Sequence, residues 1–223
     1  GLERLDGDEA VEVAELLHAQ GLRAKGPLVR VNCAAIAPEL AEAELFGHAR
    51  GAFTGAVGAR EGLIARAHGG TLVLDEVGEL PLGLQAKLLR AVQQGEAQPV
   101  GAARVERFDV RWVASTHRDL RAEASAGRFR EDLYYRLAVV ELLVPPLRER
   151  VGDVALLARS FAQQYARRFG LGSVTLDDAL VRELEARPWP GNVRELENAV
   201  ARMVALGEGP RLDVRSLAWL PPE

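Results

Sequence analysis

Two adjacent carboxylates, Asp75 and Glu76, close the apolar run GGTLVLDE (residues 69–76). A short apolar run introduced by two glycines predicts a buried strand. In a parallel sheet the carboxyl ends of the strands form the edge where ligands bind. One carboxylate could hold Mg²⁺ there, usually through water, while the other polarises a water that attacks a phosphoanhydride. The alternative is a pair of solvated acids in the loop after a strand.

A second predicted strand, VRWVAST (110–116), also ends in polar side chains. Thr116 closes this run and His117 follows it. If the two strands share a parallel sheet, Thr116 and His117 could reach the edge that carries the acids. Ordinary polarity at a strand end is the alternative interpretation.

Three arginines are candidates for contact with phosphate. Arg130 and Arg136 flank EDLYY, and on one continuous helix they would point about 240° apart. They could act as arginine fingers on a neighbouring subunit's nucleotide, or Arg136 could pair with Asp132 in its own helix. Arg194 follows WPGN at the start of a helix, where it could close over phosphates or pair with Glu197.

The elements that must position these residues alternate between strands and helices up to about residue 147. The predicted strands are 27–32, 69–76, 110–116 and 139–144, and the predicted helices are 9–20, 38–46, 82–95 and 129–137. Such alternation indicates an α/β fold with a mostly parallel sheet and helices on both of its faces. The run VVELLV (139–144) is stopped by Pro145 and Pro146.

From Gly152 onward the apolar spacing is helical only. Helices are predicted at 153–169, at 175–186 with Thr175 and Asp178 as capping-type residues, and at 190–206. We therefore expect an α/β domain over residues 1–147 and a small helical domain over 148–223.

Composition narrows the possible classes of function. The net charge of −4 provides no general attraction to nucleic acid, so DNA would be bound by segments outside this chain. No apolar run approaches the roughly 20 residues that cross a bilayer, and a cytoplasmic location without membrane contact is expected. The single cysteine, Cys33, is interpreted as a small buried residue.

The glycine-spaced run HARGAFTGA (48–56) invites comparison with a phosphate-binding loop. It follows a predicted helix instead of a strand, and it has no Gly-Lys pair. Its composition is typical of a flexible surface loop. Gly51 and Gly55 would let the tip bend, while Phe53 and Thr54 would present a ring and a hydroxyl to a partner.

Taken together, six segments resemble one known family. They are VNCAAI (31–36), ELFGHARGAFTGA (44–56), GGTLVLDEVGELP (69–81), GRFREDLYYRL (127–137), PPLRER (145–150) and WPGNVRELEN (189–198). In this order they resemble the central domain of bacterial sigma-54-dependent transcription activators, a branch of the AAA+ ATPases. The resemblance extends from about Val13 to the C-terminal region.

The resemblance implies an AAA+ α/β core with a P-loop-type parallel sheet, a helical lid, and a hexamer- or heptamer-like ring that binds ATP or ADP with Mg²⁺ between subunits. Asp75 and Glu76 resemble the Walker B pair, with Asp75 as the metal ligand, and Asn32 resembles the residue that restrains the catalytic glutamate. Thr116 and His117 match the sensor I region, Arg130 and Arg136 the trans-acting arginines, and Arg194 the sensor II arginine. Gly51, Ala52, Phe53, Thr54, Gly55 and Ala56 match the GAFTGA loop that contacts sigma-54 RNA polymerase.

The P-loop departs from the family pattern. Counted back from Val13, the loop falls on residues 4–11, where only Gly7 fits. Ala10 stands where the lysine is expected, and Asp8 and Glu9 add negative charge. The apolar strand that precedes the loop in the family is missing from the sequence, which would leave a gap in the sheet with unpaired backbone groups. Either the sequence is a segment of a longer chain, or its first residues differ from those of a working ATPase.

Two classes of function follow. The first is an ATP-driven remodeller of sigma-54 RNA polymerase that acts through the GAFTGA loop. The second is a nucleotide-incompetent interaction module that keeps the partner and assembly surfaces without efficient ATP turnover. The loss of the lysine contact favours the second, and the retained Asp75, Glu76, Arg130 and Arg136 favour the first.

Overall fold

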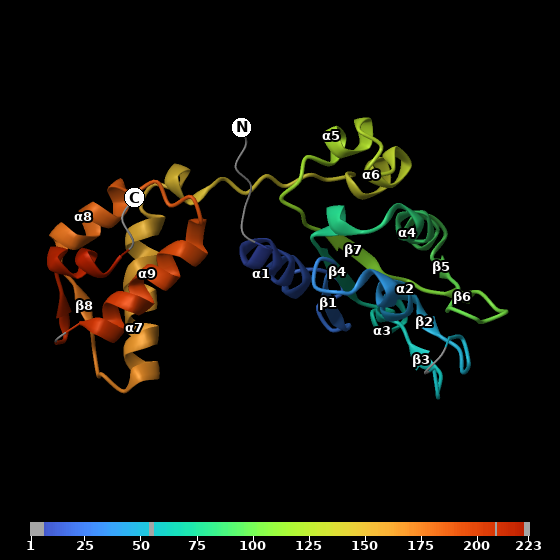
Figure 1. Ribbon diagram of the computed structural model, residues 1–223, viewed down its shortest axis with the longest axis horizontal. Helices are drawn as coiled ribbons and strands as arrows, with labels where there is room; N and C mark the ends of the chain where they lie inside the picture. Colours follow the sequence, from blue (N-terminus) through green and yellow to red (C-terminus); the bar gives the residue numbers. More distant parts are fainter. Residues whose placement is uncertain (1–6, 54–55, 208, 221–223) are drawn as a thin grey trace. The chain divides into compact units, whose positions relative to one another are not determined.

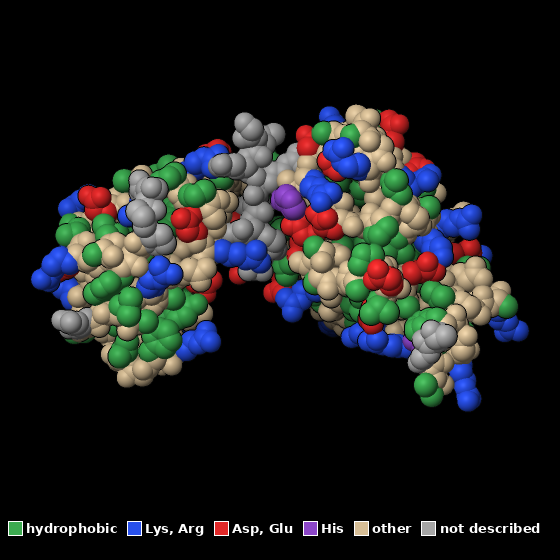
Figure 2. All heavy atoms as spheres, in the orientation of Figure 1, with side chains coloured by type: hydrophobic (Ala, Val, Ile, Leu, Met, Phe, Trp, Pro, Cys, Tyr) green, Lys and Arg blue, Asp and Glu red, His purple; other side chains and the backbone are tan. Residues whose placement is uncertain are grey.

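A computed structural model describes residues 7–53, 56–207 and 209–220. The chain forms two compact units, residues 7–143 and residues 144 onward, which are considered separately (Figure 1). Figure 2 shows acidic and basic side chains interspersed over the visible face of both units. Among the described helices, none combines the length and the hydrophobicity that crossing a membrane requires.

In the part of the chain that the structure describes, the first unit is built on a parallel sheet of three strands in the order β1-β4-β7. The strands are β1 (Leu28–Asn32), β4 (Thr71–Asp75) and β7 (Arg111–Ala114). In register, Asn32 lies opposite Asp75, and Leu74 lies opposite Ala114. The carboxyl ends of all three strands therefore meet at one edge, as the sequence predicts.

Strand β4 is buried along its whole length, so both faces of the sheet are covered. Leu72 and Leu74 belong to the main apolar core. Thr71 lies on the opposite face, where its hydroxyl is 2.9 Å from His18 Nδ1 of helix α1 (Gly7–Ala19). This arrangement confirms the expected sheet with helices on both faces.

Three of the remaining helices of this unit correspond to the predicted helices at 38–46, 82–95 and 129–137, whereas two short helices, at 63–66 and 120–125, are not predicted from the sequence. The remaining helices are α2 (Pro38–Phe46), α3 (Leu63–Arg66), α4 (Leu82–Gln94), α5 (Leu120–Ser125) and α6 (Glu131–Leu137), with a 3-10 turn η1 (Val77–Glu79). Two short antiparallel pairs join β2 (Gly47–His48) to β3 (Arg60–Glu61) and β5 (Glu96–Ala97) to β6 (Glu106–Arg107). Helix α4 ends at Gly95, whose φ of 66° is left-handed, as expected for a helix stop.

The strand predicted over residues 139–144 is wrong. These residues form no strand, and the side chains of Val139, Val140, Leu142 and Leu143 are 62–77% exposed. A strand needs a neighbour for its backbone groups. Within the described chain β7 pairs with β4 alone, and no described strand lies beside residues 139–144.

Among its described residues, the second unit packs three α-helices around its own core. Its elements are η2 (Leu147–Glu149), α7 (Asp153–Phe169), β8 (Thr175–Leu176), α8 (Asp178–Ala186), α9 (Asn192–Leu206), β9 (Arg211–Leu212) and η3 (Val214–Trp219). The expected cap of the middle helix needs correction. Thr175 lies in β8, and Asp177 is the N-cap, whose carboxylate accepts a 2.7 Å hydrogen bond from Leu180 N.

Candidate functional site

Three polar side chains lie in a row at the carboxyl edge of the described sheet: Asn32 of β1, Asp75 of β4, and Ser115, which directly follows β7. The Asp75 carboxylate lies in the middle and is only 6% exposed. Its Oδ2 accepts a 2.8 Å hydrogen bond from Asn32 Nδ2, and its Oδ1 accepts a 2.9 Å bond from Ser115 Oγ. Parallel register places all three on the same face, because Asn32 is the partner of Asp75 and Ser115 follows β7 directly.

Both polar atoms of the Asn32 side-chain amide are hydrogen-bonded. Its Oδ1 accepts hydrogen bonds from the backbone N–H groups of Ala34 (2.9 Å) and Ala35 (3.2 Å), which form an Asx turn. Its amide then points at Asp75 and not at Glu76. The structure thus gives Asn32 a different carboxylate from the one that the family resemblance implies.

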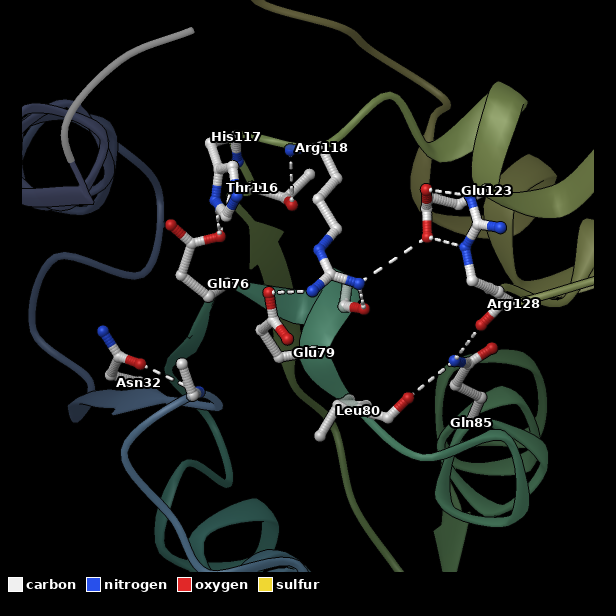
Figure 3. A network of polar contacts seen from close by, with 12 residues as sticks. Asn32, Glu76, Glu79, Leu80, Gln85, Thr116, His117, Arg118, Glu123 and Arg128 are labelled. Carbon is white, nitrogen blue, oxygen red and sulfur yellow. Dashed lines mark hydrogen bonds and ion pairs between the residues drawn. The ribbon is translucent and has the colours of Figure 1, made fainter. Parts of the chain in front are cut away.

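Glu76 is held by His117 instead. Glu76 Oε2 lies 2.8 Å from His117 Nδ1, and since a carboxylate only accepts, the proton sits on that nitrogen (Figure 3). The two residues come from the ends of neighbouring strands, so the expected meeting at one edge occurs. Glu76 also has left-handed backbone, with φ 53° and ψ 46°, which is a strained conformation for a residue with a side chain.

Thr116 turns away from the two acids. Its hydroxyl accepts a 3.1 Å hydrogen bond from the backbone N–H of Arg118. The Arg118 guanidinium in turn lies 2.5 Å from Glu79 and 3.6 Å from Glu123. Thr116 therefore shapes the loop that carries His117, and its predicted contact with nucleotide stays a prediction.

Helix α1 points its first turn toward this edge. Its last turn is fixed at the opposite end of the sheet, where His18 meets the first residue of β4 and Leu17 O accepts a 2.8 Å bond from Arg111. The helix therefore runs antiparallel to the strands. Gly7 is its first residue, so the part of the expected P-loop from residue 7 to residue 11 is helical, while residues 4–6 lie outside the described residues.

The residues present fit a nucleotide and its metal only in part. Asp75 has the carboxylate chemistry that Mg²⁺ prefers, but within the described chain no three His, Cys, Asp or Glu side chains gather to hold a metal alone. Mg²⁺ sites usually complete their shell with water and phosphate oxygens. The only lysines are Lys25, in the turn after α1, and Lys87, which pairs with Glu42, so neither follows a glycine-rich turn.

Arg130 and Arg136 lie at opposite ends of α6. Arg130 is the N-cap residue, and its guanidinium makes two hydrogen bonds, of 3.0 and 2.7 Å, with Asp132. These bonds raise the pKa of Arg130 and lower that of Asp132. Arg136 has an exposed side chain in the last turn. Asp132 pairs with Arg130, which corrects the alternative in which it pairs with Arg136.

Arg194 lies in the first turn of α9 with an exposed side chain. The turn before it is tightly built: Trp189 and Asn192 have φ of 47° and 46°, and Asn192 Oδ1 accepts a 2.8 Å bond from Leu147 N. The Glu197 carboxylate accepts a 2.9 Å hydrogen bond from the Tyr165 hydroxyl. The WPGN segment is thus a structural turn that sets the direction of α9.

The GAFTGA segment connects β2 to β3, and its base is fixed to a second loop. Ala49 N donates to Val100 O and Val100 N to Gly47 O, both at 2.9 Å. Gly51 has a left-handed φ of 76° and donates to Ala56 O. Ala52 packs closely against Gly101 of the second loop, since a Cβ added to Gly101 would lie 2.9 Å from the Cβ of Ala52.

Phe53 presents an aromatic ring on this loop. Its ring packs edge-on against His48 at 5.0 Å and remains 41% exposed. It also lines a hollow of about 200 Å³ with Leu40, Ala43 and Val100. Thr54 and Gly55 of the same motif lie outside the described residues.

Cys33 is a buried, free thiol, as the sequence predicts, and its backbone N–H donates a 2.8 Å hydrogen bond to Asp75 O. Burial, together with the negative charges of Asp75 and Glu76, raises its pKa to about 12. The thiol is therefore neutral at physiological pH and is not a nucleophile.

Sequence reasoning missed two residues that shape the edge. Ser115 could have been found from strand alternation, since it stands one residue before Thr116 in the same predicted run. Gln85, fully buried in α4, gave no sequence signal, because a glutamine in an amphipathic helix is ordinarily exposed.

Solved structures with the same fold define the class of protein. NtrX from Brucella abortus, solved in complex with ADP, superposes with a TM-score of 0.87 at 37% identity over 97% of this chain and 48% of that one. NtrX in complex with ATP gives a TM-score of 0.86 over 98% of this chain and 47% of its own. Residues 148–219 match the AAA+ ATPase lid domain. The chain is therefore an AAA+ core with a helical lid.

The family is also shown. Residues 7–143 match the sigma-54 interaction domain, and the chain belongs to that family. The regulatory protein LuxO of Vibrio cholerae is 55% identical over 190 residues, which are 85% of this chain and 36% of LuxO. The anaerobic nitric oxide reductase transcription regulator NorR of Salmonella paratyphi C is 55% identical over 199 residues, 89% of this chain and 39% of NorR. The chain thus spans well under half of these relatives.

Proposed function

We propose that this chain contacts sigma-54 RNA polymerase through the GAFTGA loop and couples that contact to a nucleotide bound between subunits. The observation that carries the contact is the half-exposed Phe53 ring on a loop whose base is hydrogen-bonded to a second loop. A fixed base with an exposed aromatic tip suits recognition of an apolar protein surface. A polymerase partner implies a cytoplasmic protein.

The carboxyl edge supplies the chemistry of the proposed nucleotide site. Asp75 would hold Mg²⁺ through water, Asn32 and Ser115 would keep its carboxylate in place, and Glu76 would orient a water. His117 would control the direction of Glu76 through the 2.8 Å contact between them. NtrX, with the same fold, binds ADP and ATP, which supports these ligands for the family.

The proposed assembly is a ring of six or seven subunits. Arg130 and Arg136, whose exposed side chains lie at the two ends of α6, would reach a neighbouring subunit's nucleotide. Arg194, at the start of α9, would contact phosphates from the lid.

Two substitutions in the loop test the partner contact. We expect Phe53→Ala and Thr54→Ala each to abolish binding to purified sigma-54, because each removes a group that touches the partner. Val57→Ala is a matched control, since Val57 lies in the same loop outside the motif and is 85% exposed. Sedimentation of the variants checks assembly, which should not change. Sigma-54 binding that is unaltered by Phe53→Ala and Thr54→Ala would refute the assignment.

The second candidate is an interaction module that does not hydrolyse ATP. It is favoured by the helical start of α1 and by Ala10 at the position of the lysine. Losing that lysine should weaken nucleotide binding by several kcal/mol, at roughly 1.5 to 3 kcal/mol per charged hydrogen bond. Titration with a fluorescent ATP analogue and a phosphate-release assay decide between the two candidates. Tight binding with turnover rejects the module.

A further inference from the structure

Gln85 is a buried polar side chain that no part of the proposed chemistry uses. It lies in the second turn of α4 and is 0% exposed. An amide buried this deeply is costly unless its donors and acceptor find partners. The partners that it finds come from two different parts of the unit, which suggests that it has more than a packing role.

The first partner belongs to the segment that follows the acidic edge. Gln85 Nε2 donates a 2.7 Å hydrogen bond to Leu80 O. Leu80 closes the short turn η1, which begins directly after the strained Glu76. The amide of Gln85 thus holds the chain four residues beyond Glu76.

The other partners belong to the segment that presents Arg130. Gln85 Nε2 also lies 3.2 Å from Arg128 O, and Gln85 Oε1 accepts a 2.8 Å hydrogen bond from Arg130 N. Phe129, which lies between these two residues, is 2% exposed. The backbone of residues 128–130 is therefore held by the hydrogen bonds of Gln85 and by the burial of the Phe129 side chain. Arg130 is the N-cap of α6, and its guanidinium direction depends on that backbone.

A second, outer connection runs between the same two segments (Figure 3). Arg118 bridges Glu79 of η1, at 2.5 Å, and Glu123 of α5, at 3.6 Å. Glu123 also receives two hydrogen bonds, of 2.8 and 2.7 Å, from Arg128, which lower the pKa of the Glu123 carboxyl. The Arg128 side chain is 62% exposed, so this connection is the more solvated of the two.

We propose that Gln85 is the positioning residue of Arg130, because its side-chain amide joins the backbone after Glu76 to the backbone that presents Arg130. The role of Arg130 toward a neighbouring nucleotide rests on the function proposed above, whereas the positioning does not. Loss of the amide would leave Leu80 O, Arg128 O and Arg130 N without their buried partner. The two sides of a shared nucleotide site would then move independently.

Amide hydrogen exchange of the 223-residue chain tests the positioning. In Gln85→Met, which keeps the volume and removes the hydrogen bonds, we expect exchange at the Arg130 amide to be at least tenfold faster relative to the core strand β4. Leu88→Ala, in the same helix and also 0% exposed, is the matched control for lost stability. It should speed exchange at Arg130 only in step with β4. Equal behaviour of the two variants would overturn the proposal.

Glu123→Gln separates the inner connection from the outer one. It breaks the ion pairs of Glu123 and leaves Gln85 intact, so exchange at Arg130 should change less than threefold. An effect as large as that of Gln85→Met would overturn the assignment to Gln85.

Sedimentation with ATP and Mg²⁺ adds the functional readout. Gln85→Met should weaken nucleotide-dependent assembly as Arg130→Ala does, whereas Leu88→Ala should not. If Arg130→Ala changes nothing while Gln85→Met still frees the Arg130 amide, the proposed role of Arg130 fails and the positioning by Gln85 stands.

Discussion

The two compact units bury polar side chains for different purposes. In the first, Asp75 and Gln85 each join segments that are distant in the sequence, with bonds that reach residues 40 to 45 positions away. In the second, Trp189 Nε1 donates to Leu184 O, five residues back, and Asn192 Oδ1 accepts from Leu147 N, 45 positions away. Both bonds fix the turn that leads into α9. The buried polar groups of the first unit thus gather at the carboxyl edge of the sheet and beside it, and those of the second unit gather at the turn before a helix.

The difference between the two units indicates which buried polar residues belong to a functional site. A buried amide that fixes the turn before a helix, as Asn192 does, accounts for itself through stability alone. Buried groups that converge on one sheet edge, beside a residue with strained backbone such as Glu76, indicate a site. Substitutions in each unit test this difference.

The largest effects should come from the two apolar cores. Leu72→Ala in β4 and Leu196→Ala in α9, both fully buried, should each lower the free energy of unfolding of their own unit by about 2–5 kcal/mol. Native-state hydrogen exchange resolved by segment measures each unit separately. If either substitution loosens both units equally, the division into two units of separate stability is wrong.

The turn of the second unit should respond next. Asn192→Ala removes the acceptor for the buried Leu147 N–H and should cost about 1–3 kcal/mol, confined to residues 144 onward. Asn192→Asp keeps an acceptor oxygen and tolerates the left-handed backbone, so it serves as the matched control. Urea denaturation followed by the fluorescence of the buried Trp189 reports the change. A full loss in Asn192→Asp as well would reject the hydrogen bond as its cause.

A smaller effect is expected at the strained residue of the first unit. Glu76→Gly and Glu76→Ala both delete the carboxylate, but only glycine adopts φ 53° without strain. Glu76→Gly should therefore be more stable than Glu76→Ala by about 1 kcal/mol. Thermal denaturation of the two variants side by side measures this difference. Equal stability would mean that the backbone relaxes at Glu76.

The smallest effect at neutral pH concerns Cys33. Its pKa is raised to about 12 in the folded chain from a reference of 9.0, so folding favours the neutral thiol. The stabilisation is complete below pH about 9 and is lost as the pH rises toward 12. Between these limits the chain should lose more stability than Cys33→Ala does, as measured by urea midpoints. Parallel loss in both would show that another group titrates.

The helices were the easiest part of the fold to predict from the sequence. Helix α7 spans residues 153–169, the range that the apolar spacing predicts, because an amphipathic stripe carries its own periodicity. The strand predicted at 139–144 failed for the opposite reason. Apolar β-branched residues favour a strand only when a neighbouring strand accepts their hydrogen bonds.

The candidate site could likewise be predicted from the sequence only in part. Asp75, Glu76, Thr116 and His117 could be found because strand ends are visible in the sequence and parallel strands bring their ends together. The pairing of Asn32 with Asp75, and of His117 with Glu76, could not be predicted, since one residue of register decides which side chains meet. The roles of these residues toward nucleotide stay predictions.

The alternation of strands and helices over most of the first unit, the family, and the absence of a lysine beside a glycine-rich turn follow from the sequence alone, because periodicity and motifs are local properties of the chain. The tertiary structure was needed to show that α1 already begins at Gly7, inside the segment where the P-loop is expected. It also shows that Glu76 has left-handed backbone and that Gln85 joins two distant segments. Each of these depends on which groups lie within hydrogen-bonding distance after the strands have aligned. Local sequence cannot encode that information alone.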